Sequence, residues 1–477
     1  MCNFRPPIMS YECTRASDHR LSMRPPRPIS PLLPCLLAVL ALGICAAPAS
    51  AGEYRAGELI VGFADATSAA QQQAIQAAAG TQPADAPSPA PTARVVEVKP
   101  GQSIGAAARE LRARDGVVYA VPNYLARASG FVPNDPRRGG ARNWRQVQWN
   151  FAGPAGINAP DAWQNMLRAG KPGGRGVVVA VLDTGVAYQT RGRFRRSPDF
   201  LTSQFTRGYD FVDRDPYPND QNGHGTFVAG VVGERTNNGI SVTGLAYGAT
   251  LMPVRVLDGE GLGDAADIAA GIRWAANRGA DVINLSLEFD TSIDASQIPS
   301  VLSAISFARS KGAVIVGASG NEAGQAIAYP ARANGVISVG ATTEHLCQAD
   351  YSNQGRGLDL VAPGGGGDAN VPGDPNCRPL DAPGPDVFQM TFKGSVKIFG
   401  LVPGYQGTSM AAPHVSAAAA LVIASGVLGR NPTAVAVERR LKATARDLGP
   451  PGYDDRYGYG LLEAAKATSA TSAAGRR

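Results

Sequence analysis

The stretch Val177-Val178-Val179-Ala180-Val181-Leu182-Asp183-Thr184-Gly185 indicates the fold of most of this chain. Six apolar, largely β-branched residues in succession are typical of a strand buried on both faces of a parallel sheet. Similar runs follow at 251–257, 282–285, 314–318 and 336–339, with helical patterns at 265–278 and 299–309. The sequence therefore predicts an α/β fold, with an open, mostly parallel sheet covered by helices on both faces and ligand chemistry at the carboxyl ends of the strands.

Length and composition limit the classes of protein that fit this sequence. The 477 residues, 44% of them hydrophobic, allow two or three domains with cores of their own. The formal net charge is +6, but the basic residues are scattered singly or in pairs between Gly and Pro. A nucleic-acid partner is therefore not expected, because binding nucleic acid usually needs a concentrated basic face.

The N-terminal segment predicts export. Two arginines precede an apolar run from Leu32 to Ala47, and Ala49-Ser50-Ala51 supplies the small residues of a cleavage site. We expect a signal peptide over residues 1–51, with the true start at Met23, and secretion to the extracellular space or periplasm. The run is broken by Pro34 and is too short for a membrane span, so no stable membrane association is expected.

Four of the six cysteines fall in this leader. Cys45 leaves a lipid-anchored form as an alternative, against which the bulky Ile44 before it argues. Cys347 and Cys377 remain in the mature chain, and an even pair in an oxidising compartment predicts one disulfide.

A small α+β domain is predicted over residues 52–128, ahead of the larger domain over 129–467 and a disordered tail over 468–477. Its patterns alternate as strand 58–63, helix 68–79, strand 94–98, helix 104–114 and strand 117–120, with a loop at 82–91.

Three segments place a reactive side chain at the end of an element, beside glycine. Asp183 ends the first strand of the larger domain, where a carboxylate can orient an imidazole. His224 lies in Asn222-Gly223-His224-Gly225-Thr226, directly before an apolar helical run. A lone His of this kind is more often structural, and Asp-Thr-Gly alone also fits an aspartic protease, which needs a second copy that this sequence lacks.

Ser409 opens an apolar helix in Gly407-Thr408-Ser409-Met410-Ala411-Ala412-Pro413-His414. We expect Pro413 to be tolerated as part of the first turn, and the Ser409 amide to face a developing oxyanion. Asn321 follows a strand and is the second candidate donor, although a Ser at a helix start is commonly only a cap.

In the order Asp, His, Ser, these segments resemble the subtilisin-like serine proteases (subtilases), in particular their thermitase- and fervidolysin-like bacterial branch. The resemblance implies that Asp183 orients the imidazole, His224 is the general base, Ser409 the nucleophile and Asn321 the oxyanion donor. It also implies that residues 52–128 form an inhibitory propeptide domain of ferredoxin-like fold.

The resemblance extends to the substrate cleft. Two segments resemble edge strands that hold an extended peptide, Gly261-Leu262-Gly263 and Ser286-Leu287-Glu288, and others resemble walls of the primary pocket: Ala318, Ser319, Gly320 and Ala328. The family usually has Gly where Glu288 stands. Glu288 is therefore either a selector of basic side chains or a solvated carboxylate at the rim.

Calcium is the expected cofactor, and no organic cofactor is expected. One site resembles the family's tighter calcium site and consists of Asp135, Asp199 and Asn238 with the carbonyls of Thr236, Ile240 and Val242. A second, weaker loop holds Asp210, Asp213 and Asp215. The alternative for each single Asp is that it stabilises a turn or caps a helix.

The sequence thus predicts a secreted serine endopeptidase made as a self-processing zymogen, cleaved between Tyr124 and Val132. Its partners would be protein or peptide substrates and its own propeptide, and it would act as a monomer. The alternative is a secreted, non-catalytic pseudoprotease or binding protein on the same fold. The segment 364–406 is expected to be a surface loop near the cleft entrance, pinned to Cys347.

Overall fold

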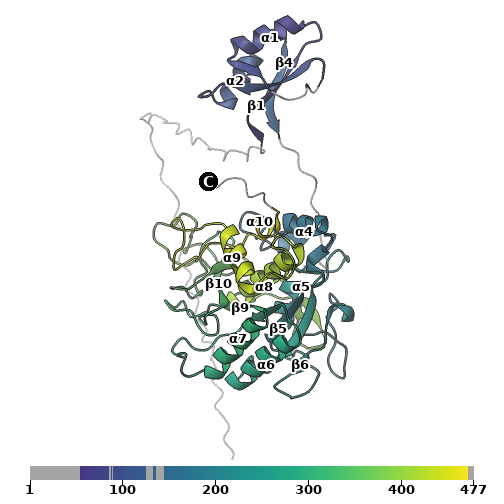
Figure 1. The fold of residues 1–477 in the computed structure, drawn as a ribbon, viewed down its shortest axis with the longest axis vertical. Helices are drawn as coiled ribbons and strands as arrows, with labels where there is room; N and C mark the ends of the chain where they lie inside the picture. Colours follow the sequence, from purple (N-terminus) through teal and green to yellow (C-terminus); the bar gives the residue numbers. More distant parts are fainter. Residues whose placement is uncertain (1–53, 85–87, 89, 125–132, 136–143, 471–477) are drawn as a thin grey trace, which may run out of the picture. The chain divides into compact units, whose positions relative to one another are not determined.

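The computed structural model describes residues 54–84, 88, 90–124, 133–135 and 144–470 and divides the chain into two compact units, Met1–Arg127 and Ala128–Arg477 (Figure 1). The predicted signal peptide and residues 471–477 of the predicted tail lie outside the described residues.

The N-terminal unit is a four-stranded antiparallel sheet with two helices, in the order β2-β3-β1-β4. Its elements are β1 (Tyr54–Phe63), α1 (Ala69–Ala78), β2 (Thr81–Pro83), β3 (Ala93–Val98), α2 (Ile104–Arg112) and β4 (Val117–Tyr124). Alternate residues of β1, Leu59, Val61 and Phe63, pack with Leu111 of α2 in one core. This is the predicted ferredoxin-like fold, except that β2 was expected as part of a loop.

The C-terminal unit is built on a seven-stranded parallel sheet in the order β11-β10-β9-β8-β5-β7-β6. The strands are β5 (Val178–Asp183), β6 (Tyr209–Asp210), β7 (Thr250–Arg255), β8 (Val282–Leu285), β9 (Val314–Ala318), β10 (Val336–Thr342) and β11 (Leu360–Pro363). After β5 the chain forms β6 at the edge of the sheet and then β7 between β6 and β5, and from β8 onward it builds outward on the other side of β5. The carboxyl ends of β5 and β8 therefore flank the crevice where such sheets bind ligands.

Helices cover both faces of this sheet, as predicted (Figure 1). One core contains the apolar residues of α4 (Ala159–Arg168), α5 (His224–Gly233), α8 (Thr408–Ser425) and α9 (Ala434–Thr444). The other contains those of α6 (Ala265–Asn277) and α7 (Pro299–Ser310), which lie side by side. Short helices complete the unit: α3 (Trp144–Val147), α10 (Ala464–Thr468) and two 3-10 turns, Pro172–Gly174 and Thr202–Gln204.

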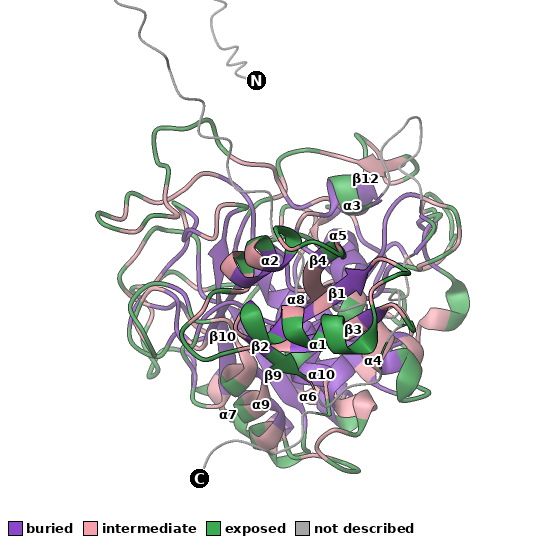
Figure 2. Ribbon diagram, turned by 90° about the horizontal axis from the view of Figure 1, so that it is seen from above, coloured by how far each residue is buried: buried purple, intermediate pink, exposed green. Residues whose placement is uncertain are grey.

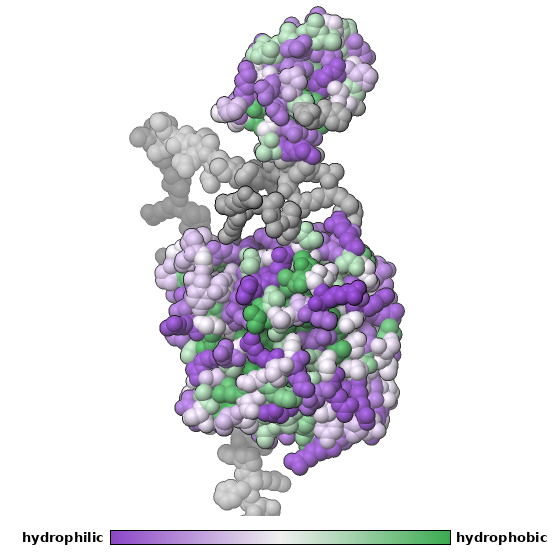
Figure 3. Space-filling view, in the orientation of Figure 1, coloured by the Kyte–Doolittle hydropathy of each residue, from purple (hydrophilic) through white to green (hydrophobic). Residues whose placement is uncertain are grey.

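Helix α8 is apolar on all sides because it runs through the interior. Its composition and length would suit a membrane span, but 78% of its 18 residues are buried within the protein. Figure 2 shows α8 and α5 in the buried centre, while α7 and α9 expose one side. On the face seen in Figure 3, hydrophilic and hydrophobic residues are interspersed.

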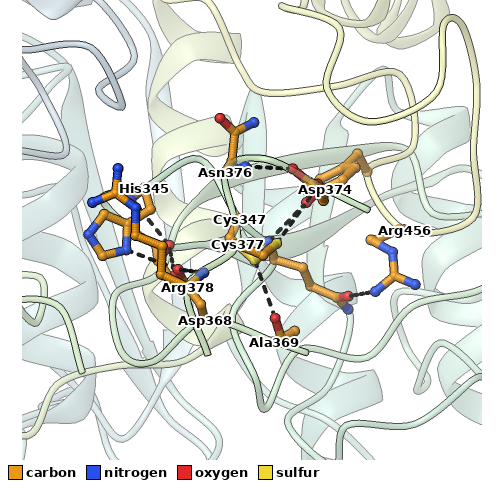
Figure 4. Close-up of a disulfide and its surroundings, with 12 residues drawn as sticks. His345, Cys347, Asp368, Ala369, Asp374, Asn376, Cys377, Arg378 and Arg456 are labelled. Atoms are coloured by element: carbon orange, nitrogen blue, oxygen red, sulfur yellow. Dashed lines mark hydrogen bonds and ion pairs between the residues drawn. A yellow bond between two sulfur atoms is a disulfide. The ribbon is translucent and has the colours of Figure 1, made fainter. Parts of the chain in front are cut away.

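The segment 364–406 differs from the predicted surface loop. It contains an antiparallel hairpin of β12 (Met390–Phe392) and β13 (Phe399–Leu401), and Val387, Gln389 and Thr391 are fully buried. The predicted disulfide joins Cys377 in its first half to Cys347 outside the segment, and beside this bond Asp368 binds His345 and the amide of Arg378 (Figure 4). The segment is thus anchored at its first half, and its second half packs into the core.

Candidate active site

Asp183 and His224 form a direct hydrogen bond at the crevice. Asp183 is the last residue of β5 and His224 the first of α5, and the imidazole Nδ1 lies 2.7 Å from the carboxylate Oδ1. Asp183 is fully buried, whereas the His224 side chain is 24% exposed. Because Nδ1 carries the proton that is donated to the carboxylate, the neutral ring presents its lone pair at Nε2, as a general base requires.

Glycine allows the helix to start this close to the strand. A Cβ at Gly225 would clash with the carbonyl oxygen of Gly185 and lie 3.0 Å from the Asp183 side chain. The backbone of Gly223 has φ 111°, a left-handed conformation that favours glycine. The glycines on both sides of His224 thus position it.

A buried polar network that the sequence did not indicate holds the same turn. Asp220 accepts hydrogen bonds from the amides of Asn222, Gly223 and Thr226 and from the hydroxyls of Thr184 and Thr226, at 2.6–2.9 Å. The Thr184 hydroxyl in turn accepts the amide of Gly225 at 2.9 Å. One buried carboxylate therefore ties the end of β5 to the start of α5. A sequence signal exists only in the spacing of Asp220, four residues before His224.

The charges around His224 favour its protonated form. Burial lowers the pKa of His224, but the charge and hydrogen bond of Asp183 raise it, the charge of Asp220 adds to this, and the net pKa is raised. The ring is thereby a stronger base than a free imidazole and is suited to take a proton from a hydroxyl.

Ser409 lies in the first turn of α8, so its amide N–H has no partner along the helix. Pro413 lies beyond that turn, contrary to the prediction, and cannot donate to the Ser409 carbonyl as an ordinary residue would. The Ser286 hydroxyl donates to that carbonyl instead, at 2.8 Å. Because Pro413 has no amide N–H, the Ser409 carbonyl is free to accept the Ser286 hydroxyl. This hydrogen bond joins helix α8 to the cleft segment after β8.

The Ser409 hydroxyl has a resting partner. It donates to the carbonyl of Ser286 at 3.3 Å, so it must rotate toward His224 before the imidazole can take its proton. A loose hydroxyl contact of this kind is common in free enzymes and tightens when substrate binds.

Asn321 follows β9, and its side-chain amide has a fixed orientation. Its Oδ1 accepts the amide of Thr408 at 2.8 Å and the Thr408 hydroxyl at 3.1 Å. Since a backbone N–H can only donate, the oxygen must face Thr408 and the Nδ2 group must face away from it. Asn321 therefore presents two N–H donors, which suits an oxyanion hole.

His224 and Ser409 meet in one cleft of about 360 Å³, whose lining includes neither Asn321 nor the buried Asp183. Its lining includes His224 and Ser409 together with both predicted edge segments, 261–263 and 286–288. The predicted wall residues Ala318, which ends β9, Ser319 and Ala328 are buried and are not among the residues that line this cleft, and Ala328 donates its amide to the Ser319 carbonyl at 2.8 Å. Leu257 and Ile268, which the sequence reasoning missed, add apolar lining to the cleft.

The first predicted calcium site has the donor set that a hard cation needs. Burial raises the pKa of Asp199 to about 7, with the Asn238 hydrogen bond opposing and the charge of Asp135 adding to the shift. Asp199 Oδ2 is buried without a hydrogen-bond partner. Within the described part of the chain, no hydrogen bond ends on the carbonyl oxygens of Thr236, Ile240 or Val242. Asp135 and Asn238 Oδ1 already accept backbone amides, so the fit to calcium rests on the unpaired oxygens of Asp199 and the three carbonyls, which a cation would satisfy.

The second predicted loop is arranged differently. Arg255 of β7 is buried, and its guanidinium lies 2.9 Å from Asp210 and 2.7 Å from Asp213. Asp215 instead accepts the amide of Tyr217 at 2.8 Å. Among the described residues no group of three or more His, Cys, Asp or Glu side chains is placed to hold a metal. The geometry does not support a three-carboxylate calcium site in this loop.

An α/β sheet with a Ser, His and Asp constellation at its crevice defines the class of nucleophilic serine hydrolases. Residues 174–460 match the Subtilase family, and residues 44–123 match the Fervidolysin N-terminal prodomain. The chain belongs to the subtilase family, and it is a serine endopeptidase made as a zymogen with a prodomain.

Several relatives span both parts of the chain or its catalytic part. A thermophilic serine proteinase of Bacillus sp. strain AK1 is 32% identical over 85% of this chain and 86% of its own length. Subtilisin BL of Lederbergia lenta is 37% identical over 68% of this chain and 99% of its own length. A solved protease structure from Pseudoalteromonas arctica PAMC 21717 has a TM-score of 0.56 at 33% identity and covers 71% of this chain and 99% of that chain.

Proposed function

We propose that Ser409, His224, Asp183 and Asn321 are the catalytic residues of this endopeptidase. The observation that carries the proposal is the 2.7 Å bond between Asp183 and His224 at the cleft that Ser409 also lines. In the first step His224 Nε2 takes the Ser409 proton while Oγ attacks the peptide carbonyl carbon. The Asn321 side-chain N–H and the Ser409 amide then hold the negative oxygen of the tetrahedral intermediate.

The remaining steps use the same groups. His224 returns its proton to the leaving amine, the peptide C–N bond breaks, and an ester on Ser409 remains. A water molecule then attacks this ester with His224 again as base, which releases the new carboxyl end and restores the serine. Asp183 keeps the ring in one tautomer and stabilises its charged form throughout.

The substrate would lie extended in the cleft. Residues 261–263 and 286–288 offer backbone groups on the lining, which suits recognition by strand addition. Ala318, Ser319, Gly320 and Ala328 would form the walls of the primary pocket, whose small side chains leave room for a large residue. Substrate selection would then depend on the few larger side chains that reach this pocket.

Calcium would bind to Asp135, Asp199 and Asn238 with the carbonyls of Thr236, Ile240 and Val242. When bound, the ion supplies positive charge that offsets two buried carboxylates, and no step of hydrolysis passes through it. The expected effect is on folding stability, because a ligand that binds only the folded form stabilises it.

Maturation would remove the signal peptide 1–51 and then the propeptide 52–128 by self-cleavage between Tyr124 and Val132. The mature enzyme, 129–467 with its tail, would be secreted and act as a monomer on proteins or peptides. The leader pattern before Ala51 supports export, and the match to a prodomain family supports an intramolecular inhibitor.

The test is expression of residues 52–477 with calcium as wild type, Ser409→Ala and Ser425→Ala, followed over time by intact mass. Ser425 lies at the other end of α8 and serves as the matched control. Self-processing by Ser409 predicts loss of the propeptide in the wild type and the control only. Equal trimming of all three would assign the cut to another protease, and failure of Ser409 to react with a fluorophosphonate would favour a pseudoprotease.

A further inference from the structure

We infer that Glu288 selects positively charged side chains at the primary pocket and that their entry frees the oxyanion donor Asn321. The inference rests on the proposed function, because it concerns how the same cleft chooses its substrate. It assigns a specificity role to a carboxylate that stands three residues beyond β8, within the cleft lining.

Glu288, on the segment after β8, lies against the segment after β9, and we take these two segments as the walls of the primary pocket. Its Oε1 and Oε2 lie 3.4 and 3.5 Å from Asn321 Nδ2. A methyl group on Gly320 would lie 3.0 Å from Oε2, so the carboxylate also lies against the backbone of that wall. The next residue, Phe289, donates its amide to the carbonyl of Tyr329 at 2.7 Å, which joins the two wall segments at their base. A substrate side chain that enters between the walls must therefore meet this carboxylate.

The carboxylate lacks a cation of its own. None of the ion pairs among the described residues includes Glu288. Glu288 is exposed in the free enzyme; partial desolvation still raises its pKa, the Asn321 hydrogen bonds oppose this, and the charge of Glu322 adds to the shift. Glu260 also lines the cleft, and no Lys or Arg is among the lining residues of this part of the chain.

Charge alone then ranks the substrates. A guanidinium or ammonium would supply the missing partner and form a charge-assisted hydrogen bond with Glu288. A carboxylate would be repelled, and an apolar side chain would leave Glu288 desolvated and unpaired. The cleft therefore favours Arg or Lys immediately before the scissile bond.

The same contact affects turnover. Thr408 fixes the oxygen of the Asn321 side chain. The Nδ2 group therefore stays directed toward Glu288 and the position of the oxyanion. With Glu288 unpaired, a negative charge remains beside the donor and opposes the charge that develops on the substrate oxygen. A cationic substrate side chain removes this opposition, so the preference should appear in kcat as well as in KM.

The experiment compares matched fluorogenic peptides that differ only at the residue before the scissile bond: Arg, Lys, Met, Leu and Glu. Rates at pH 8 are normalised to the fraction of enzyme that a fluorophosphonate labels at Ser409. Wild type is expected to prefer Arg over Leu by about 10- to 100-fold in kcat/KM, the range of a charge-assisted hydrogen bond. Glu288→Gln should lower this ratio at least tenfold, and Glu288→Lys should raise cleavage after Glu.

Asp294→Asn is the control, since Asp294 is exposed and its charge is not among the groups that shift the pKa of Glu288. It should keep the wild-type ratio. Equal cleavage after Arg and Leu by wild type would overturn the inference even if no variant folded. A ratio unchanged in Glu288→Gln would also overturn it, while labelling of Ser409 in the same samples would leave the proposed function intact.

Discussion

Around His224 the hydrogen bonds that orient the imidazole and the turn beneath it are formed without substrate, although Asp183 Oδ2 is buried without a partner, whereas the contacts of Ser409 and Asn321 are long. The imidazole is held by Asp183, and the turn beneath it by the buried Asp220. The Ser409 hydroxyl instead contacts a backbone carbonyl at 3.3 Å, and Asn321 Nδ2 lies 3.4 Å from Glu288. The completed half holds the geometry of the base, and the incomplete half is where a substrate supplies the missing partners.

The two acidic loops show the same contrast. Asp210 already binds Arg255, so its carboxylate has a partner, although Arg255 Nε is buried without one. Asp199 keeps a buried oxygen without a partner, so its loop is incomplete. The comparison teaches that an acidic cluster in a sequence predicts a ligand only where the fold leaves its oxygens unpaired. The predictions below test complete and incomplete regions in turn.

The largest effect is expected from Asp183→Asn, which breaks the completed half. An amide in place of the carboxylate would hold the imidazole in the wrong tautomer, and a loss of about 10⁴-fold in kcat is expected. The variant would release its own prodomain slowly, so trace wild-type enzyme is added to process it, and single turnovers are then followed. A loss below tenfold, with thermal unfolding unchanged, would show that the bond does not orient the base.

Calcium should stabilise the protein through the loop of Asp199 and not through the loop of Asp210. Chelation is expected to remove about 2.7 kcal/mol at a hundredfold excess of calcium over Kd, or roughly 5–10 °C in Tm. Asp199→Asn should abolish this calcium-dependent increment. Asp210→Asn should keep the increment and lower the baseline by about 1–3 kcal/mol, because Arg255 loses a buried partner.

Differential scanning calorimetry of Ser409→Ala protein, whose propeptide is first removed with trace wild-type enzyme, measures these increments with and without chelator and free of self-digestion. A calcium increment lost in Asp210→Asn and kept in Asp199→Asn would reverse the assignment of the two loops.

The strands and helices that carry the reactive groups could be predicted from the sequence, because they depend on local pattern. The apolar run before Asp183 predicted β5, and the glycines around His224 and the helix after Ser409 located the reactive groups. The antiparallel β2 was missed because Thr81–Pro83 is too short for a periodic signal.

The remaining features depend on long-range partners that no local pattern reveals. Arg255 lies 45 residues from Asp210, and Ser286 lies 123 residues from Ser409. Pro413 was placed in the first turn of α8 because the helix start was not known to within one turn. Glu288 was noticed only as a departure from a family pattern, and its contact with Asn321 needs the fold.

A smaller effect is expected from Thr408→Val, which loosens the incomplete half. The Thr408 hydroxyl donates to Asn321 and accepts the amide of Gly320 at 3.2 Å. Without this hydroxyl the side chain of Asn321 is held less firmly in the orientation that the oxyanion needs. Losing one hydrogen bond of this strength predicts a decrease of about tenfold in kcat with little change in KM. Thr408→Ser keeps the hydroxyl and should restore the rate. A change confined to KM would mean that Thr408 acts on substrate binding instead.

The smallest effect is a shift of the pH profile in Asp220→Asn. The charge of Asp220 raises the pKa of His224, so its removal should lower that pKa. Because the base must be neutral, kcat/KM falls as the pH drops through the His224 pKa, and the acid limb of the variant should lie at lower pH than that of wild type.

Asp294→Asn, at an exposed position, removes the same charge far from the ring and should leave the limb in place. Since an amide N–H would face the Thr226 donors, Tm is recorded for both variants. A limb that stays in place in Asp220→Asn, with folding preserved, would restrict Asp220 to holding the turn and leave Asp183 as the group that sets the basicity of His224.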